Sequence, residues 1–490
     1  MDESLRKKLD AMFFPESVAI IGASDIPGKW GFMITTAILS GGFKGKIYPI
    51  NTKKELILDL KTYPDLESVP DKVDLAIITI PAVHVCNALK DCIKKGTTSV
   101  VIISSGFKET GEEGRKLEQE INEIAKDSGL VFLGPNTMGS ISTHAGLTAI
   151  GVPVFPGKGS LGVISQSGNI GVQIIQWTIN RGMGVCFYAG TGNEAILKAG
   201  TLLEYFGERD EVNGIAMYLE GVENGRQFME IARKTTRKKP VVALKTGRSK
   251  TGSKAAQSHS GAMAGSFETY TAMFKQTGII QVKNPTELLN VAGAMTNLPI
   301  PKSNRVGIMS LGGGWGVVTA DECESQGLVL PPLSEDIIEE LNKHVPAYWN
   351  KSNPIDLVGE NKPELHLKTL ELLANWDMID SIITLGVVGT LKIVEDFIQS
   401  QEKVLGSILS KELKLSIIKD HIKTENKFIS EMARLQKETG KPIISVSLGE
   451  GIQTLQHTSY GPAMCLTTPE EAASILSYMA SYSQYLKNLD

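Results

Sequence analysis

The stretch SLGVISQSGNIG (160–171) contains the pattern that decides the fold of this 490-residue chain. It begins with a mostly apolar run, as in a strand buried on both faces, continues through a turn of Ser and Gly, and then opens a helix. The same order recurs in SVAIIGAS (17–24), KIYPIN (46–51), LAIITIP (75–81), SVVIISSGF (99–107), LVFLGPN (130–136), GVCFYAGTG (184–192), GIAMYLEG (214–221), VVALKTG (241–247), RVGIMSLGG (305–313), SIITLGVVG (381–389) and PIISVSLG (442–449). Strands that alternate with helices in this way predict parallel sheets covered on both faces, and hence a doubly wound α/β fold.

Two stretches rich in Pro and Gly interrupt the alternation, GVPVFPGKGS (151–160) and NLPIPKSN (297–304). A chain of this length has room for about three domains. We therefore expect three doubly wound domains, at residues 1–150, 155–298 and 302–490.

The composition excludes several classes of function. A net charge of −4 gives no indication of a nucleic-acid or acidic-membrane partner. The five cysteines form no CxxC pair, which is typical of a reducing compartment. The N-terminal MDESLRKKLDAMFFPES lacks the apolar core of a signal peptide, and no apolar run approaches the roughly 18 residues of a membrane span. We expect a soluble cytoplasmic protein with no nucleic-acid or membrane partner.

The third domain reads as a copy of the second. NRVGIMSLGGGWG (304–316) aligns with the opening stretch so that Ser310 matches Ser165 and Gly316 matches Gly171. The later strands VVALKTG and PIISVSLG also correspond. The copy has no counterpart of His259, and its strand TLGVVG has no counterpart of Glu220. We therefore expect the chemistry in the second domain.

The first domain carries a glycine-rich turn in VAIIGASDIPGKWG (18–31), between a strand and a helix, where backbone N–H groups can hold phosphate. Its spacing matches neither GxGxxG nor the P-loop GxxxxGK[ST]. At the end of the second strand, YPINTKK (48–54) offers Asn51, Lys53 and Lys54 instead of the carboxylate that binds the ribose of NAD. These lysines suit a ribose that carries a phosphate, as in coenzyme A or NADP. The alternative is that they belong to a solvated turn.

Two turns of the second domain predict a phosphate site. SQSGNIG (165–171) and GTGNEA (190–195) each follow a strand, and each is expected to open a helix, with Asn193 at the mouth of the second. Both turns would lie at the carboxyl edge of the sheet, where ligands bind. Two helix N-termini directed at one point would stabilise a phosphate between them. Either turn alone also fits an ordinary strand–helix connection.

His259 lies in KAAQSHSGAMAG (254–265), among small residues that leave room for a bulky group to reach its imidazole. Glu220 ends the apolar strand of GIAMYLEG and could accept one imidazole N–H, which leaves the other nitrogen nucleophilic. The alternatives are an incidental histidine in a surface loop and a Glu220 that caps the next helix. The sequence contains no cluster of metal ligands, and we expect no metal site on this chain.

Six motifs together resemble the α subunits of ADP-forming acetyl-CoA synthetases, within the ADP-forming acyl-CoA synthetase family that includes succinyl-CoA synthetase α. They are GASDIPGKWG (22–31), GPNTMG (134–139), SQSGNIG, GTGNEA, MYLEG (217–221) and SHSGAMAG (258–265), in order over almost the whole chain. The resemblance implies a Rossmann-like CoA-binding domain followed by two flavodoxin-like domains of the succinyl-CoA-synthetase type. It also implies the reaction acyl-CoA + phosphate + ADP ⇌ carboxylic acid + CoA + ATP, through an acyl phosphate and a phosphohistidine. One departure is Ser260, where relatives usually have Thr, and both are small hydroxyl residues.

The resemblance also implies roles for individual residues. His259 takes the phosphoryl group, and Glu220 orients its ring. The phosphate and acyl site is expected to comprise Ser165, Gln166, Ser167, Gly168 and Asn193. Coenzyme A is expected to contact Gly22, Ser24, Gly28, Lys29, Asn51, Lys53, Lys54, Pro81 and Asn136.

A partner chain is the last expectation from the resemblance. ADP or ATP with Mg²⁺ would bind a separate ATP-grasp β subunit, in an α2β2 assembly, because no later stretch of this sequence offers such a module. Two other functions stay open at this point. A CoA-binding regulatory protein would need neither His259 nor Glu220, and an NADP-dependent oxidoreductase would leave the second domain unexplained. The small carboxylic acid is not specified by the sequence.

Overall fold

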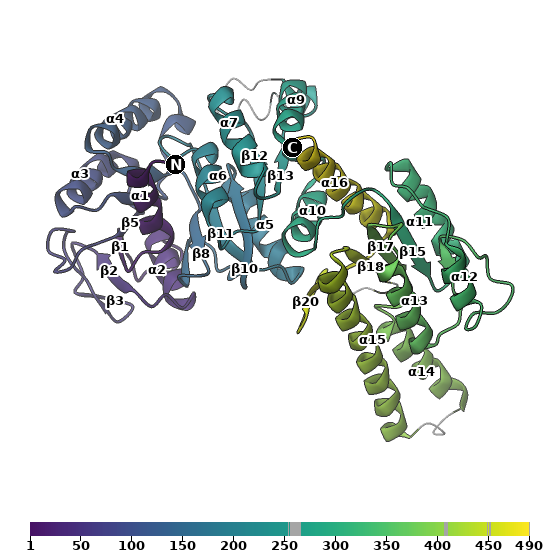
Figure 1. Cartoon of the computed structure of the whole chain (residues 1–490). Coiled ribbons are helices and arrows are strands. Elements are labelled where there is room, and N and C mark those ends of the chain that lie inside the picture. Colours follow the sequence, from purple (N-terminus) through teal and green to yellow (C-terminus); the bar gives the residue numbers. More distant parts are fainter. Residues whose placement is uncertain (253, 255–265, 406–409, 448, 450–451, 490) are drawn as a thin grey trace. The chain divides into compact units, whose positions relative to one another are not determined.

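The computed structural model describes residues 1–252, 254, 266–405, 410–447, 449 and 452–489. The chain forms two compact units, Met1–Ala292 and Gly293–Asp490 (Figure 1). Two large sheets belong to the first unit and one to the second, and each is built mostly of parallel strands. The predicted doubly wound α/β fold is confirmed. Within the described residues, no helix combines the length and the apolar character needed to cross a membrane.

The first sheet has the order β2-β1-β5-β6-β7, and all its strand pairs are parallel. Its strands are β1 (Ser17–Ile21), β2 (Lys46–Ile50), β5 (Leu75–Ile78), β6 (Ser99–Ile102) and β7 (Val131–Leu133). A short hairpin of β3 (Leu56–Ile57) and β4 (Leu60–Lys61) follows β2.

Alternate residues of β1 enter cores on opposite faces of this sheet. Val18 and Ile20 belong to a core with side chains of helices α1 (Glu3–Phe13) and α2 (Trp30–Ser40). Ala19, between them, belongs to a second core with side chains of α3 (Val85–Lys95) and α4 (Glu112–Ser128). The near-continuous apolar run of this strand is therefore explained by helices on both faces.

The second sheet has the order β14-β13-β12-β10-β11-β8-β9. Its parallel strands are β10 (Lys158–Ser165), β11 (Val185–Gly190), β12 (Gly214–Leu219), β13 (Val241–Lys245) and β14 (Ile280–Val282). Helices α5 (Gly168–Asn180), α6 (Ala199–Glu208), α7 (Gly225–Thr236) and α9 (Phe267–Thr277) connect them, and α10 (Pro285–Asn297) follows β14.

An antiparallel hairpin of β8 (Gly139–Ser142) and β9 (Leu147–Ile150) completes the second sheet, because β8 pairs with β11. The sequence pattern assigned residues 139–150 to the first domain, whereas their backbone hydrogen bonds join them to the second sheet. Leu147 shares a single core with Leu133 of the first sheet and Phe187 of the second. This shared core explains why the two sheets form one compact unit.

The third sheet has the order β16-β15-β17-β18-β20-β19. Its strands are β15 (Val306–Ser310), β16 (Ile355–Asp356), β17 (Ser381–Leu385), β18 (Ile443–Val446), β19 (Leu455–Thr458) and β20 (Gly461–Leu466). Its helices are α11 (Gly313–Ser325), α12 (Glu335–Leu341), α13 (Pro363–Asn375), α14 (Leu391–Leu405), α15 (Lys411–Thr439) and α16 (Pro469–Lys487). The order β16-β15-β17-β18-β20 reproduces β11-β10-β12-β13-β14 of the second sheet. The two domains therefore share a topology, as the sequence repeat predicted.

Candidate active site

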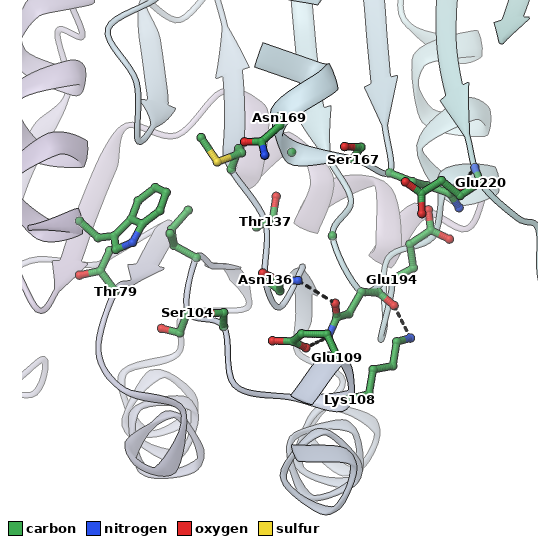
Figure 2. Close-up of a pocket in the computed structure, with 18 of the residues that line it drawn as sticks. Thr79, Ser104, Lys108, Glu109, Asn136, Thr137, Ser167, Asn169, Glu194 and Glu220 are labelled. Atoms are coloured by element: carbon green, nitrogen blue, oxygen red, sulfur yellow. Dashed lines mark hydrogen bonds between the residues drawn. The ribbon is translucent and has the colours of Figure 1, made fainter. Parts of the chain in front are cut away.

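A cavity of about 1000 Å³ in the first unit is lined by both of its large sheets (Figure 2). The lining residues 79–81, 103–105 and 136–138 follow β5, β6 and β7 of the first sheet. The lining residues 166–169, 192–194 and 220–223 follow β10, β11 and β12 of the second. Ligands of doubly wound proteins bind at the carboxyl ends of the strands. Two such ligand-binding edges open into one space here.

The turn between β10 and α5 provides one wall of the cavity. Ser167 is the N-cap of α5, and its Oγ accepts a hydrogen bond from the Ile170 N–H at 3.5 Å. A side chain at Gly168 would meet Met138, because a Cβ there would lie 2.5 Å from the Met138 Cγ. Asn169, which the sequence analysis did not single out, also lines the cavity. The first N–H groups of a 13-residue helix make this wall suitable for an anion.

Ser165, which was predicted for the phosphate and acyl site, is not among the residues that line the cavity. Its side chain is fully buried, and its Oγ donates a hydrogen bond to the Ser167 carbonyl oxygen at 2.7 Å. The hydroxyl therefore stabilises the turn. Gln166 lines the cavity, but its side-chain amide bonds to the backbone of residues 220 and 221.

Glu220 lies directly after β12, on the same wall, and is 8% exposed. The alternative that it caps the next helix is wrong, because the N-cap of α7 is Asn224, whose side chain accepts from the Gln227 N–H. His259 lies outside the described residues. The segment that leads to it leaves the sheet beside Glu220, since the Thr246 N–H donates to the Leu219 carbonyl oxygen at 3.0 Å.

Asn193 is not at a helix mouth, as the sequence analysis expected. Helix α6 begins only at Ala199, and a turn with left-handed backbone at Gly192 (φ 56°) and Glu194 (φ 53°) intervenes. The Asn193 Nδ2 donates to the carboxylates of Glu109 at 2.7 Å and Glu118 at 2.8 Å. Its side chain thus joins the turn after β11 to the helical region that follows β6.

Further contacts strengthen this junction. The Lys108 Nζ donates to the Asn193 carbonyl oxygen at 2.6 Å and lies 3.3 Å from the Glu118 carboxylate. Asn136 donates to the Asn193 Oδ1 at 3.3 Å. Burial raises the pKa of Glu109, but hydrogen bonds from Asn193 and nearby backbone N–H groups outweigh it and lower the pKa overall. The contacts of the junction therefore favour the ionised form of Glu109.

Glu194 is a buried carboxyl group that the sequence analysis did not assign. It lines the cavity, and its Oε1 accepts from the Ala199 N–H at 3.0 Å, at the start of α6. Burial raises its pKa, opposed by hydrogen bonds from Thr191, Gln166 and Ala199. Glu194 belongs to the predicted turn GTGNEA (190–195), but the sequence analysis gave a role in that turn only to Asn193.

The residues predicted for coenzyme A gather at the carboxyl edge of the first sheet. The backbone of Gly22 (φ 95°) and Gly28 (φ 85°) is left-handed, and Lys29 is the N-cap residue of α2. The Ser24 Oγ accepts from the Ile26 N–H at 3.1 Å. Trp30, at the start of α2, lines the cavity together with the predicted Pro81 and Asn136.

The turn after β2 approaches the glycine-rich turn. The Asn51 Nδ2 donates to the Ala23 carbonyl oxygen at 2.9 Å, and its Oδ1 accepts from the Lys53 N–H at 2.8 Å. The Lys54 ammonium is paired with the Asp25 carboxylate, a partner that the sequence analysis missed. The pKa of Asp25 is lowered, chiefly by this hydrogen bond from Lys54. Lys53 is exposed beside this ion pair.

Three family models match consecutive parts of the chain. They are a CoA binding domain over residues 16–143, a succinyl-CoA ligase like flavodoxin domain over 158–295, and a Ligase-CoA domain over 306–418. The chain is 42% identical over 382 residues to the acetate–CoA ligase [ADP-forming] II subunit alpha of Pyrococcus furiosus. The matched region covers 78% of this chain and 83% of the relative. This chain belongs to the ADP-forming acetate–CoA ligase family. As a member, it is an acid–thiol ligase.

A second sequence relative and a solved structure are also similar to this ADP-forming ligase. Acetate–CoA ligase [ADP-forming] I of Archaeoglobus fulgidus is 37% identical over 81% of this chain, but only 57% of that protein is covered. A solved dinucleotide forming acetyl-coenzyme A synthetase 1 of Ca. Korarchaeum cryptofilum, in complex with phosphate and ADP, is 31% identical with a TM-score of 0.83 over 98% of each chain. These similarities support the acyl-CoA synthetase interpretation and neither alternative. In the part of the ligase that the structure describes, no group of three or more His, Cys, Asp or Glu residues could hold a metal ion.

Proposed function

We propose that this chain is the α subunit of an ADP-forming acyl-CoA synthetase, which converts acyl-CoA, phosphate and ADP to a carboxylic acid, CoA and ATP. The observation that carries the proposal is the cavity shared by two sheet edges. Trp30, which directly follows the glycine-rich turn proposed for CoA, belongs to one wall. The N-terminus of α5 and the Glu220 carboxylate belong to the other.

The first step is attack of phosphate on the thioester. Phosphate bound at the α5 N-terminus would accept hydrogen bonds from backbone N–H groups, with Ser167 and Asn169 beside it. One phosphate oxygen forms a bond to the thioester carbonyl carbon. The carbon–sulfur bond breaks, its electron pair leaves with the sulfur of CoA, and an acyl phosphate remains in the cavity.

The second step transfers the phosphoryl group to His259. One imidazole nitrogen attacks phosphorus, the bond to the acyl oxygen breaks, and the carboxylate leaves. Glu220 accepts the other ring N–H, which holds the nucleophilic tautomer and stabilises the positive charge that develops on the ring. The course of the chain supports this pairing, since the segment toward His259 leaves the sheet next to Glu220.

Coenzyme A would enter along the edge of the first sheet. Its 3′-phosphate carries the charge that Lys53 and Lys54 would attract, and the left-handed glycine turn gives the diphosphate access to backbone N–H groups. Pro81 and Asn136, on the cavity wall, would lie nearer the thioester end.

The nucleotide would bind a second chain. The relative named subunit alpha is covered over 83% of its length, whereas the Archaeoglobus fulgidus relative, whose name mentions no subunit, is covered over only 57%. The extra length of the latter supports a nucleotide module that can be fused or separate. We propose that here an ATP-grasp β subunit binds ADP or ATP with Mg²⁺, in an α2β2 assembly.

A coupled assay tests this proposal. ATP formation from ADP and phosphate is measured over a panel of acetyl-, branched-chain and aryl-acyl-CoA thioesters, with this chain alone and with the ATP-grasp chain of the same organism added. We expect CoA binding by this chain alone and ATP only from the mixture. ATP formation by the isolated chain would contradict the proposal that the nucleotide binds a separate subunit.

A further inference from the structure

The side-chain amide of Gln166 is fully engaged with the strand end that carries Glu220. Its Oε1 accepts hydrogen bonds from the backbone N–H groups of Glu220 and of Gly221, the latter at 3.0 Å. Its Nε2 donates to the Gly221 carbonyl oxygen at 2.7 Å. These three bonds tie the turn after β10 to the end of β12 at the residue that bears the carboxylate.

The third domain provides an internal control for this contact. Ser165 pairs with Tyr218 in the second sheet, and Ser310 pairs with Leu385 in the third. Counting onward from these pairs, Leu311 corresponds to Gln166 and Val387 corresponds to Glu220. The copy that lacks the carboxylate therefore also lacks the amide.

The backbone of the turn is nevertheless the same in both copies. The Gln166 N–H donates to the Tyr218 carbonyl oxygen at 3.2 Å, and the Leu311 N–H donates to the Leu385 carbonyl oxygen at 3.1 Å. The serine that precedes each of them, Ser310 in the copy, donates its hydroxyl to the carbonyl oxygen two residues later. The fold of the turn thus does not require an amide at this position.

We propose that Gln166 is a positioning residue for Glu220, and that its amide holds the strand end so that the carboxylate meets the imidazole of His259. This inference rests on the proposed function. An acceptor that binds two consecutive N–H groups fixes the orientation of both peptide groups, and with them the direction of the Glu220 Cα–Cβ bond. The buried Glu194 carboxyl group also interacts with the Gln166 side chain.

The test uses Gln166→Leu, which copies the residue of the third domain, with Gln166→Met as a second variant of similar length. Gln176→Leu is the matched control, because it removes an amide from α5 whose partner is Asn180. Hydrogen exchange at the Glu220 and Gly221 amides reports the positioning, and isothermal titration reports CoA affinity. Stopped-time labelling with acetyl-CoA and radioactive phosphate reports phosphoenzyme formation.

We expect both Gln166 variants to speed exchange at these two amides and to slow labelling by about 10-fold to 100-fold, as for a small misplacement of a catalytic group. CoA affinity should stay within about twofold, and Gln176→Leu should match the wild type. In the Glu220→Gln background the same variants should slow labelling by less than about threefold, because they act through Glu220.

Unchanged exchange, or an equal slowing with and without Glu220, would overturn the positioning role. No label on the wild-type protein would instead overturn the proposed function on which that role rests.

Discussion

Replacing Asn193 by Ala should destabilise the first unit rather than weaken phosphate binding. The Asn193 Nδ2 donates to two carboxylates, at 2.7 Å to Glu109 and at 2.8 Å to Glu118, and Glu118 is only 5% exposed. A hydrogen bond to a charged group contributes about 1.5–3 kcal/mol. Each carboxylate keeps other donors, among them Lys108 for Glu118. We therefore expect the free energy of unfolding to fall by about 2–4 kcal/mol.

The effect should depend on pH with a definite sign. Because the pKa of Glu109 is lowered in the folded protein, its contribution to stability is present above the ordinary glutamate pKa and is lost as the pH falls through the lowered value. The cost of Asn193→Ala should accordingly be largest near neutral pH. It should shrink in acid, below the ordinary value of about 4.3.

Native-state hydrogen exchange is the suitable assay, because it reports the opening of one unit without requiring the whole chain to unfold together. The slowest amides of β10 and β11 give the free energy for the first unit. Asn169→Ala is the control, since Asn169 also lines the cavity but is exposed, and it should change that energy by less than about 0.5 kcal/mol. Unaltered exchange in Asn193→Ala, together with a loss of phosphate affinity, would show that Asn193 is a ligand residue and not a structural one.

Three further predictions concern the turns and the buried carboxyl group. Lys54→Ala should weaken the binding of CoA about tenfold and that of dephospho-CoA hardly at all. Asp25→Asn should strengthen the binding of CoA, because it releases Lys54 from its ion pair. Both affinities are measured by calorimetric titration, and equal effects on the two ligands would contradict a contact with the 3′-phosphate. Glu194→Gln should raise the thermal midpoint of unfolding at neutral pH. Burial raises the pKa of Glu194, so ionisation of this carboxyl group destabilises the folded protein as the pH rises. The gain from Glu194→Gln should vanish below about pH 4.3, where the carboxyl group is protonated in both the folded and the unfolded protein. Gly28→Ala should lower the free energy of unfolding by only about 1–2 kcal/mol, through its left-handed backbone, since nothing lies within 4 Å of the new Cβ. Gly31→Ala should lower it further in the same thermal melts, because its Cβ would lie 2.0 Å from a backbone oxygen.

The architecture could be predicted from the sequence because local patterns of apolar and turn residues indicate its strands and helices. Apolar runs such as those around Val18 and Val163 can only be buried on both faces, and the repeated order of strand, turn and helix then leaves a parallel sheet. Residues 139–150 were predicted to belong to the first domain, whereas they pair with the second sheet, because strand pairing is a long-range choice that no local pattern encodes. Their partner β11 lies more than 40 residues away along the chain.

The site was predictable in location but not in detail. Residue type and position at a strand end identified Glu220 and the turn before α5 as cavity residues. The partners of polar side chains could not be read from spacing. Asn193 bonds to the carboxylates of Glu109 and Glu118 in the helical region that follows β6, and Gln166 bonds to backbone, although both residues suit a phosphate site equally well. A motif indicates where polar groups gather, and only the three-dimensional structure shows which of them are already paired.

The central claim is that this chain carries a phosphoryl group on His259, and direct labelling tests it. The full-length protein is incubated with radioactive phosphate and acetyl-CoA, quenched, and assayed for protein-bound label after acid or base treatment. We expect a label that acid removes and base preserves, that is absent in His259→Ala, and that forms about 10²–10⁴-fold more slowly in Glu220→Gln. A label that survives acid, or that persists in His259→Ala, would contradict it.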